Sequence, residues 1–199
     1  MFNDRVHAMT VLGNGLSEAH MPSECLNVLE AQLATAKRIG RSLGGMALDL
    51  DQVYGNLSNC YASLGRHEDS FRLDREVYTI RKRSRGFDVS TLSAANNLIL
   101  SLGRPEHTEE RTALFSEVLP HARALGTENT NLSLRLRAAY AKHLSMGAES
   151  RNLIAAVTEL EDVYRISKRV FGPSHPASQS RLSGLEMARE RLARARDLN

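Results

Sequence analysis

The chain repeats part of itself at a fixed distance, and this repetition narrows the folds open to it. Residues 76–86 read EVYTIRKRSRG and residues 162–172 read DVYRISKRVFG, so six of eleven positions are identical. The two segments lie 86 residues apart, which is two units of 43. Self-similarity with a period of roughly 20–50 residues is typical of proteins built by stacking one small structural unit. We therefore expect a repeat protein with units of about this length.

Glycines divide each unit into two helices. Gly44, Gly86, Gly126 and Gly172 each close a run of helix-forming residues, and each run has basic residues in its last turns. Glycine readily takes the positive φ that stops a helix, and cations stabilise the negative end of the helix dipole. Shorter glycine turns, as at residues 64–66, fall between these stops. The expected helices cover residues 2–12, 22–40, 46–64, 67–84, 88–102, 106–124, 129–146, 149–170 and 175–196.

Composition agrees with an all-helical chain. Aromatic residues make up 5% of the 199 positions and Trp is absent, while Ala, Leu, Arg and Glu, which favour helices, are frequent. Hydrophobic residues at 42% and charged residues at 25% are ordinary for a folded domain. No apolar run is long enough to span a membrane, and no signal-peptide core is expected near the first residues.

The second unit carries the residues of a known repeat. Tyr54, Leu57, Ser58, Tyr61 and Gly65 stand where the first helix of a tetratricopeptide repeat has Trp, Leu, Gly, Tyr and its turn residue. The chain therefore resembles tetratricopeptide repeat proteins. In the second helix of this unit, Ser70 takes the position of a small residue, and Asp74 stands where an aromatic residue is expected, a contact that Leu73 could supply instead.

The linker over residues 171–177, FGPSHPA, narrows the resemblance to the kinesin light chain subtype, whose linker reads Leu-Gly-x-x-His-Pro. Gly172 is expected to supply a left-handed stop and Pro176 to lie in the first turn of the next helix. The resemblance implies an all-α, right-handed superhelical solenoid of antiparallel helix pairs. It implies a single repeat domain over residues 1–199, with repeats at about 1–44, 45–86, 87–126 and 127–172 and a capping helix at 173–199.

Two cysteines, Cys25 and Cys60, lie inside helical patterns. Two are too few for a disulfide framework, so we expect two buried thiols. Buried thiols fit a reducing compartment, the cytoplasm first, with the nucleus and an organelle interior left open.

No combination of residues typical of catalysis is present. The seven histidines form no His-x-x-x-His pair, and there is no Cys-x-x-Cys and no Gly-x-Ser-x-Gly. Residues 13–15, Gly-Asn-Gly, lack the Gly-Lys of a phosphate-binding loop and are expected to form a turn. We expect no enzyme activity, cofactor or metal, although a metal site assembled across repeats stays a minor alternative.

Basic clusters have a structural interpretation and a functional one. Residues 81–85, RKRSR, and the equivalent residues 168–169 favour cations at helix C-termini over a nuclear import signal or a phosphate-binding patch. In the last helix, arginines are expected on the outside and an apolar stripe on the inside, which favours capping over nucleic-acid or lipid binding. The arginines are Arg189, Arg191, Arg194 and Arg196, and the stripe is Leu182, Leu185, Ala188 and Leu192. A net charge of +3, with acidic residues interleaved, does not favour nucleic acid as a partner.

The first helix of each unit lines the concave face in this fold, where solenoids bind their partners. Helical spacing places a polar stripe on these helices, and the resemblance implies that Asn56 grips the backbone of a bound peptide, although Gly55 replaces its usual Asn neighbour. The two cations of the fourth repeat, Arg135 and Lys142, lie seven residues apart on one helix face and favour an acidic partner. The candidate partner-binding residues are Gln52, Asn56, Asn59, Ser63, Ser90, Ser93, Asn97, Ser101, Asn131, Arg135 and Lys142.

Two functions are open from the sequence. The first is a non-catalytic module that binds a peptide or a partner protein on its concave face, which an amide and hydroxyl groove suits. The second is a structural subunit or scaffold packed permanently in a larger assembly. A regulatory domain of a longer enzyme or motor-linked chain is a weaker third. The partner and the oligomeric state stay open.

Overall fold

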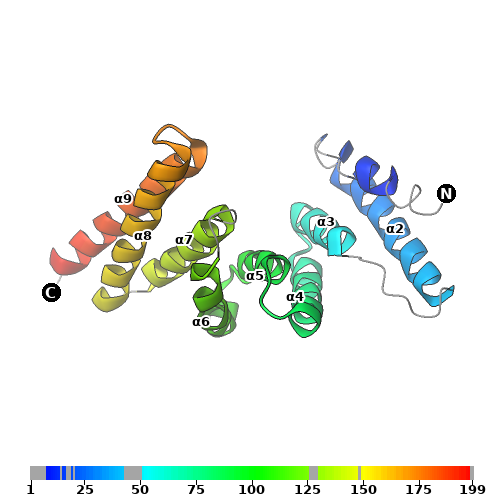
Figure 1. The fold of residues 1–199 in the computed structure, drawn as a ribbon, viewed down its shortest axis with the longest axis horizontal. Coiled ribbons are helices and arrows are strands. Elements are labelled where there is room, and N and C mark those ends of the chain that lie inside the picture. The colour runs from blue at the N-terminus through cyan, green and yellow to red at the C-terminus, as the bar shows by residue number, and fades with distance from the viewer. Residues whose placement is uncertain are drawn as a thin grey trace. The chain divides into compact units, whose positions relative to one another are not determined.

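The computed structural model describes residues 8–13, 15, 16, 19, 21–42, 51–125, 130–147 and 149–197. These residues form a succession of α-helices with no strand among them (Figure 1). The helices are α2 (Pro22–Ser42), α3 (Asp51–Ser63), α4 (His67–Arg85), α5 (Val89–Ser101), α6 (Thr108–Arg123), α7 (Thr130–Met146), α8 (Ser150–Phe171) and α9 (Pro176–Asp197). A short 3-10 helix, η1 (Pro105–His107), precedes α6. No helix within the described ranges is long and apolar enough to cross a membrane.

The helix positions expected from the sequence agree with these bounds to within a few residues wherever both ends are described. Two of the expected stops, Gly44 and Gly126, lie outside the described residues, as does the expected start of a helix at residue 46. Residues 8–13 are helical, in line with the first expected helix.

Three glycines end helices or turns with a positive φ, as the sequence predicts. The φ angles are 73° at Gly65, 65° at Gly86 and 89° at Gly172. The ψ angles of Gly86 and Gly172 are −144° and 160°, so Gly172 is not in the left-handed helical conformation that we expected of it, and neither is Gly86. They occupy a more extended region that is essentially restricted to glycine. After Gly86 the next helix is capped by Asp88, whose carboxylate accepts a hydrogen bond of 2.7 Å from the backbone N–H of Thr91.

The described chain divides into two compact units, residues 1–108 and residues 109–199. In the first unit α2 packs on α3, α3 on α4, and α4 on α5. Its core joins α2 to α3 through Cys25, Leu26, Leu29, Leu57 and Cys60. Leu73 of α4 packs against this core, which is the contact expected from it in place of the aromatic residue.

In the second unit α7 packs on α8, and α9 packs on both. Small residues allow this close approach, because Ala141, Ala156 and Ala188 are buried together with Leu160 and Leu185. Phe115 of α6 packs on the rings of α7, at 5.4 Å from Tyr140 and 5.3 Å from His143 between ring centres. In α9, Leu185, Ala188 and Leu192 are buried and Leu182 is half-buried, while the four arginines expected outside are exposed.

Candidate partner-binding site

The first unit has a hollow of about 480 Å³ lined by α3, α4, α5 and the turn after α5. The first-helix elements α3 and α5 contribute Asn59, Asn97 and Ser101, and α4 contributes the buried residues Ser70 and Asp74. Most of its lining residues are thus polar, and its volume lies within the range of roughly 300–1,000 Å³ that is typical of ligand sites.

Asp74 lies in this hollow with a side chain held by hydroxyl groups. The hydroxyl of Ser101 donates a hydrogen bond to Oδ2 of Asp74, and Ser58 makes a second hydrogen bond to the same carboxyl. Ser58 Oγ also lies 2.9 Å from Ser70 Oγ, where α3 and α4 approach closely. Burial raises the pKa of Asp74 above its ordinary value of 3.8, and the two hydroxyl hydrogen bonds offset this only in part.

Three of the polar residues predicted in the first unit come together in this hollow, namely Asn59, Asn97 and Ser101. Ser63 instead donates a hydrogen bond of 3.0 Å to the carbonyl of Asn59 in its own helix. The carbonyl of Ser90 accepts a hydrogen bond of 2.9 Å from Arg81 Nη1. Elsewhere on the predicted stripe, Ser93 is exposed, Asn56 is half-buried, and the side chain of Gln52 lies outside the described part.

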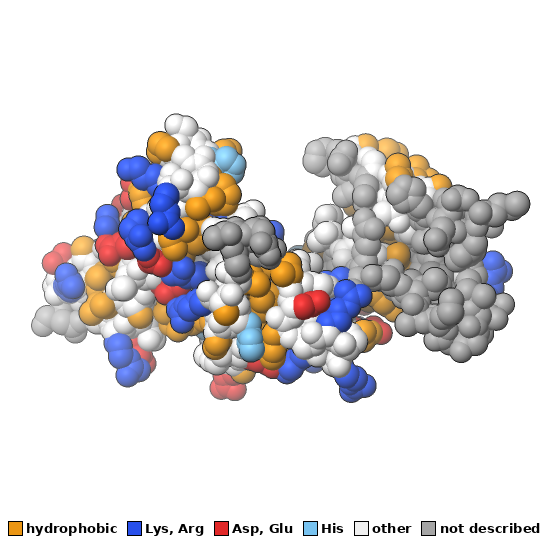
Figure 2. Space-filling model, in the orientation of Figure 1, with side chains coloured by type: hydrophobic (Ala, Val, Ile, Leu, Met, Phe, Trp, Pro, Cys, Tyr) orange, Lys and Arg blue, Asp and Glu red, His pale blue; other side chains and the backbone are white. Residues whose placement is uncertain are grey.

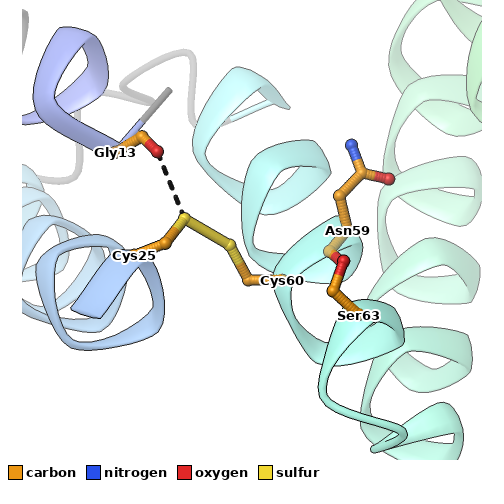
Figure 3. The surroundings of a disulfide bond; sticks show 5 residues. All are labelled: Gly13, Cys25, Asn59, Cys60 and Ser63. Carbon is orange, nitrogen blue, oxygen red and sulfur yellow. Dashed lines mark hydrogen bonds between the residues drawn. A yellow bond between two sulfur atoms is a disulfide. The ribbon is translucent and has the colours of Figure 1, made fainter. Parts of the chain in front are cut away.

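The structure corrects the prediction for the cysteines. Both are buried, as expected, but Cys25 and Cys60 form a disulfide that links α2 to α3, so neither is a free thiol (Figure 3). Their Cα atoms are 6.7 Å apart, within the usual range for a disulfide. This pairing could not be predicted from local sequence patterns, because 35 residues separate the two positions. Bridged cysteines do not indicate a reducing compartment.

The disulfide also shows how α3 distributes its side chains. Cys60 points toward α2, whereas Asn59 and Ser63 point to the other side of the helix (Figure 3). Cys25 Sγ lies 3.2 Å from the carbonyl oxygen of Gly13. A Cβ at Gly13 would lie 2.8 Å from Leu29 Cδ2, so a larger residue here would require the side chain of Leu29 to shift.

The second unit has a hollow of about 430 Å³ between α7 and α9, with Leu160 of α8 among its lining residues. It combines cationic residues, Lys142, Arg181 and Arg191, with exposed apolar ones, Met146 and Met187. Figure 2 shows Lys and Arg side chains gathered over the region of α7 to α9 among hydrophobic and acidic ones. The predicted residue Lys142 thus belongs to a cationic and apolar hollow.

Arg181 is a buried cation with no carboxylate partner within the described ranges. Its guanidinium donates to Ser167 Oγ at 2.9 Å and to Asn131 Oδ1 at 3.0 Å. Burial lowers the pKa of Arg181, and the nearby charge of Arg135 lowers it further. The predicted residues therefore separate: Asn131 holds Arg181 in place, Arg135 is exposed beside it, and Lys142 lines the hollow.

Both hollows contain residues that are not among the partner-binding residues predicted from the sequence. Asp74 and Arg181 lie on helices outside the predicted stripe, and Arg191 was predicted only to be on the outside of the last helix. Arg104 lines the mouth of the first hollow and pairs with Glu106 at 3.7 Å. In the part of the chain that the structure describes, no three His, Cys, Asp or Glu side chains are grouped to hold a metal ion.

Comparison with known proteins agrees with this arrangement of helix pairs. A family model described as tetratricopeptide repeat matches residues 52–88 and 148–177. The chain therefore contains two segments that match tetratricopeptide repeats. The first match covers α3 and α4, and the second covers α8 and the linker that leads into α9. No curated protein sequence shows significant similarity to it.

Solved structures of tetratricopeptide-like repeats share its fold. The kinesin light chain-like repeat protein of Podosopora anserina is 18% identical, with a TM-score of 0.68 over 98% of this chain and 91% of that one. BtubC (BKLC) from P. vanneervenii is 14% identical, with a TM-score of 0.70 over 99% of this chain and 82% of that one. The predicted fold class, an all-α solenoid of helix pairs, is confirmed.

Proposed function

We propose that this protein is a non-catalytic interaction module that binds a peptide segment or partner protein on the faces lined by its first helices. The fold implies a protein-interaction or scaffold module. The observation that carries the finer proposal is the position of the two hollows, one lined by α3 and α5 and the other by α7 and α9. Of these helices, α3, α5 and α7 are the first helices of their repeats, which line the concave face where solenoids bind partners.

Exposed apolar residues support the same faces. Leu100 is 63% exposed and lines the first hollow, and Met187 is 58% exposed and lines the second. An apolar side chain beside polar and charged groups in a concavity is the usual composition of a binding site. A partner would remove these side chains from water, which favours association.

In the second unit the chemistry favours an acidic segment or a free carboxylate. Lys142 and Arg191 are exposed at the hollow, and no carboxylate among the described residues pairs with Arg181, which also lines it. Cations placed to donate hydrogen bonds to a carboxylate form stronger contacts than neutral donors. The methionines beside them can adapt their shape to an apolar side chain of the same segment.

The test is capture of partners from extracts of the source cell, followed by titration of the purified partner against matched variants. Lys142→Ala/Arg191→Ala removes two cations from the hollow, and Arg151→Ala/Arg169→Ala removes two exposed cations from α8. We expect the first variant to bind about tenfold more weakly, within the range of about 1–3 kcal/mol for charged contacts, and the second to bind within about twofold of the parent. Equal loss in both variants, or loss in neither, would rule out this hollow as the site.

A permanent structural role is the second candidate. Ile154 and Val170 on α8 and Ile80 on α4 are each close to half exposed, and none of them lines either hollow. Apolar residues on second helices would suit a partner packed against the outer face. A chain that aggregates when purified alone but not in its complex would favour this role, and a stable monomer would favour the interaction module.

A further inference from the structure

The hollow of the first unit contains a carboxylate, Asp74, that no cation among the described residues neutralises. Asp74 is 5% exposed, and no Lys or Arg side chain pairs with it within the described ranges. Its hydrogen bonds come from the neutral hydroxyls of Ser101 and Ser58. A buried carboxylate normally has a cationic partner or is replaced by an apolar residue, because leaving its charge uncompensated is costly.

The carboxyl group has acceptor capacity left over. An ionised carboxylate offers about four acceptor positions, and the two serine hydroxyls use two of them. Ser101 and Ser58 lie on α5 and α3, so they hold the carboxyl between the two first helices of the unit. Because Asp74 lines the open hollow, its remaining acceptor positions can be reached by a ligand there.

The walls of the hollow add acceptors and an apolar surface. Asn59 on α3 and Asn97 on α5 line the hollow beside Asp74, and each amide has an oxygen that accepts hydrogen bonds. Leu100 gives an exposed apolar wall next to them. The cation of the hollow, Arg104, is exposed at the mouth and pairs with Glu106. His67 is exposed there too.

We propose that this hollow binds the side chain of an arginine in a partner segment, with its guanidinium on Asp74 and its methylene stem along Leu100. The inference deepens the proposed function and rests on it, because it names the side chain of the partner that the binding face of the first unit recognises. The guanidinium has five N–H donors in a planar fork, which suits a carboxylate flanked by amide oxygens. The ammonium of lysine is a compact point charge with three donors, so lysine binds more weakly here.

The test uses a defined peptide and its uncharged twin. The probe is the pentapeptide Ac-Gly-Ser-Arg-Ser-Gly-NH2, and the twin carries citrulline, which has the shape of arginine without the charge. Binding is followed by chemical-shift changes in the ¹⁵N-labelled protein. We expect the arginine peptide to bind the parent at least about tenfold more tightly than the citrulline peptide, as charge pairs shielded from water do, and the lysine peptide to fall between them. No binding, or no preference for arginine, would overturn the proposal.

Two variants separate the carboxylate from general effects of charge. Asp74→Asn keeps the size of the side chain and removes its charge, and Glu76→Gln makes the same change at an exposed position of the same helix. We expect Asp74→Asn to bind the two peptides within about twofold of each other, and Glu76→Gln to keep the tenfold preference. A preference that survives in Asp74→Asn would overturn the assignment of Asp74.

A gain of binding tests the site without removing Asp74. Asn97→Asp adds a second carboxylate to the hollow at a half-buried position, and we expect it to bind the arginine peptide about threefold or more tightly than the parent. An unchanged affinity would contradict the proposal, including in the case where Asp74→Asn does not fold. Free argininamide is the last arm, and if it bound as tightly as the peptide, the hollow would serve a small molecule and not a partner segment.

The proposal and the proposed function fail in different ways. If the partner that depends on Lys142 and Arg191 binds Asp74→Asn as well as the parent, the interaction function stands and the arginine pocket falls. If the arginine preference is present and the captured partner ignores Lys142 and Arg191, the pocket stands and the assignment of the second hollow falls.

Discussion

Two charged residues of this protein are buried near the expected binding faces, although charged side chains usually stay exposed to water. Asp74 is buried at a position where the repeat usually has an aromatic side chain, and Arg181 is buried with only neutral acceptors. Both raise the free energy of the folded state, because a charged side chain loses hydration without gaining an opposite charge. Such positions are typical of sites that are completed by a ligand.

Replacement of Asp74 by Asn should stabilise the protein in a way that depends on pH. Burial raises the pKa of Asp74 in the folded state, so the folded protein binds the proton more tightly than the unfolded chain. The parent therefore loses stability as the pH rises from about 3.8 through the folded pKa, and the Asn variant does not. We expect the difference in Tm between variant and parent to grow in favour of the variant from pH 4 to pH 7. A difference that stays constant or shrinks would contradict this.

Gly65→Val should destabilise the first unit. The φ angle of Gly65 is 73°, and a Cβ there would meet no atom within 4 Å, so the penalty is conformational rather than steric crowding by neighbours. Backbone strain of this kind costs about 1–3 kcal/mol, and β-branched residues resist it most. The control is Gly55→Ala inside α3, where a Cβ also has open space and helix propensity should add about 0.5–1 kcal/mol. Chemical denaturation measures both, and equal effects would show that the turn is not strained.

Pairs of helices are held by contacts that differ between the units. In the second unit Arg137 of α7 bonds to Glu159 at 2.6 Å and to Asp162 at 2.5 Å on α8. Arg137 is the main cause of a lowered pKa at Asp162. In the first unit the disulfide links α2 to α3 covalently. These are contacts between neighbouring elements, and each can be tested without touching the hollows.

Arg137→Ala should loosen α7 from α8. It removes hydrogen-bonded ion pairs from a guanidinium that is only 12% exposed, and it leaves Glu159, which is 15% exposed, with Arg123 as its remaining cation. Hydrogen bonds to charged groups contribute about 1.5–3 kcal/mol, so we expect a loss in this range in urea unfolding. Arg165→Ala, which removes an exposed partner of Asp162 within α8, should cost less than about 1 kcal/mol. Equal losses would show that the pairs between helices add nothing special.

Reduction of the disulfide should destabilise the first unit. The bridge joins positions 35 residues apart. Closing a loop of this length restricts the unfolded chain and raises its free energy by about 3–4 kcal/mol. We expect Tm to fall on addition of a phosphine reductant, and Cys60→Ser to show the lower Tm with or without it. Mass spectrometry after alkylation of the unfolded protein gives the thiol count. Two free thiols before reduction would contradict the bridge.

For the whole molecule, charge is the property that governs encounters with a partner. The net charge of +3 is small, but three cations line the hollow of the second unit, and no carboxylate is among its lining residues. Exposed charge pairs are screened by salt over a distance of about 8–10 Å at physiological ionic strength.

Binding of an acidic partner should therefore weaken as salt rises. We expect the parent to lose affinity between low and high salt, and Lys142→Ala/Arg191→Ala to lose clearly less over the same range, because its salt-sensitive contacts are already gone. Titration at two salt concentrations measures both slopes. The Arg151→Ala/Arg169→Ala protein is the control, and a slope equal to that of the hollow variant would contradict the prediction.

Local signals determined the fold of this chain. Helix lengths, the glycine stops at residues 65, 86 and 172 and the apolar stripe of the last helix depend on residues within a few turns of each other, so they can be read along the sequence. The repeat of 43 residues then predicts helix pairs, since one pair cannot bury its apolar face without a neighbour.

Only the tertiary structure decided which side chains meet. Cys25 meets Cys60 across 35 positions, Asp74 meets Ser101 across 27, and Arg181 meets Asn131 across 50. Each pairing depends on the rotation of one helix against the next, and helical periodicity does not specify that rotation to within a single side chain. The sequence therefore predicted a polar stripe on the first helices. Packing determined that the first unit buries a carboxylate, Asp74, and that the second unit buries a guanidinium, Arg181, because burial of a charge is a property of the neighbours that surround it.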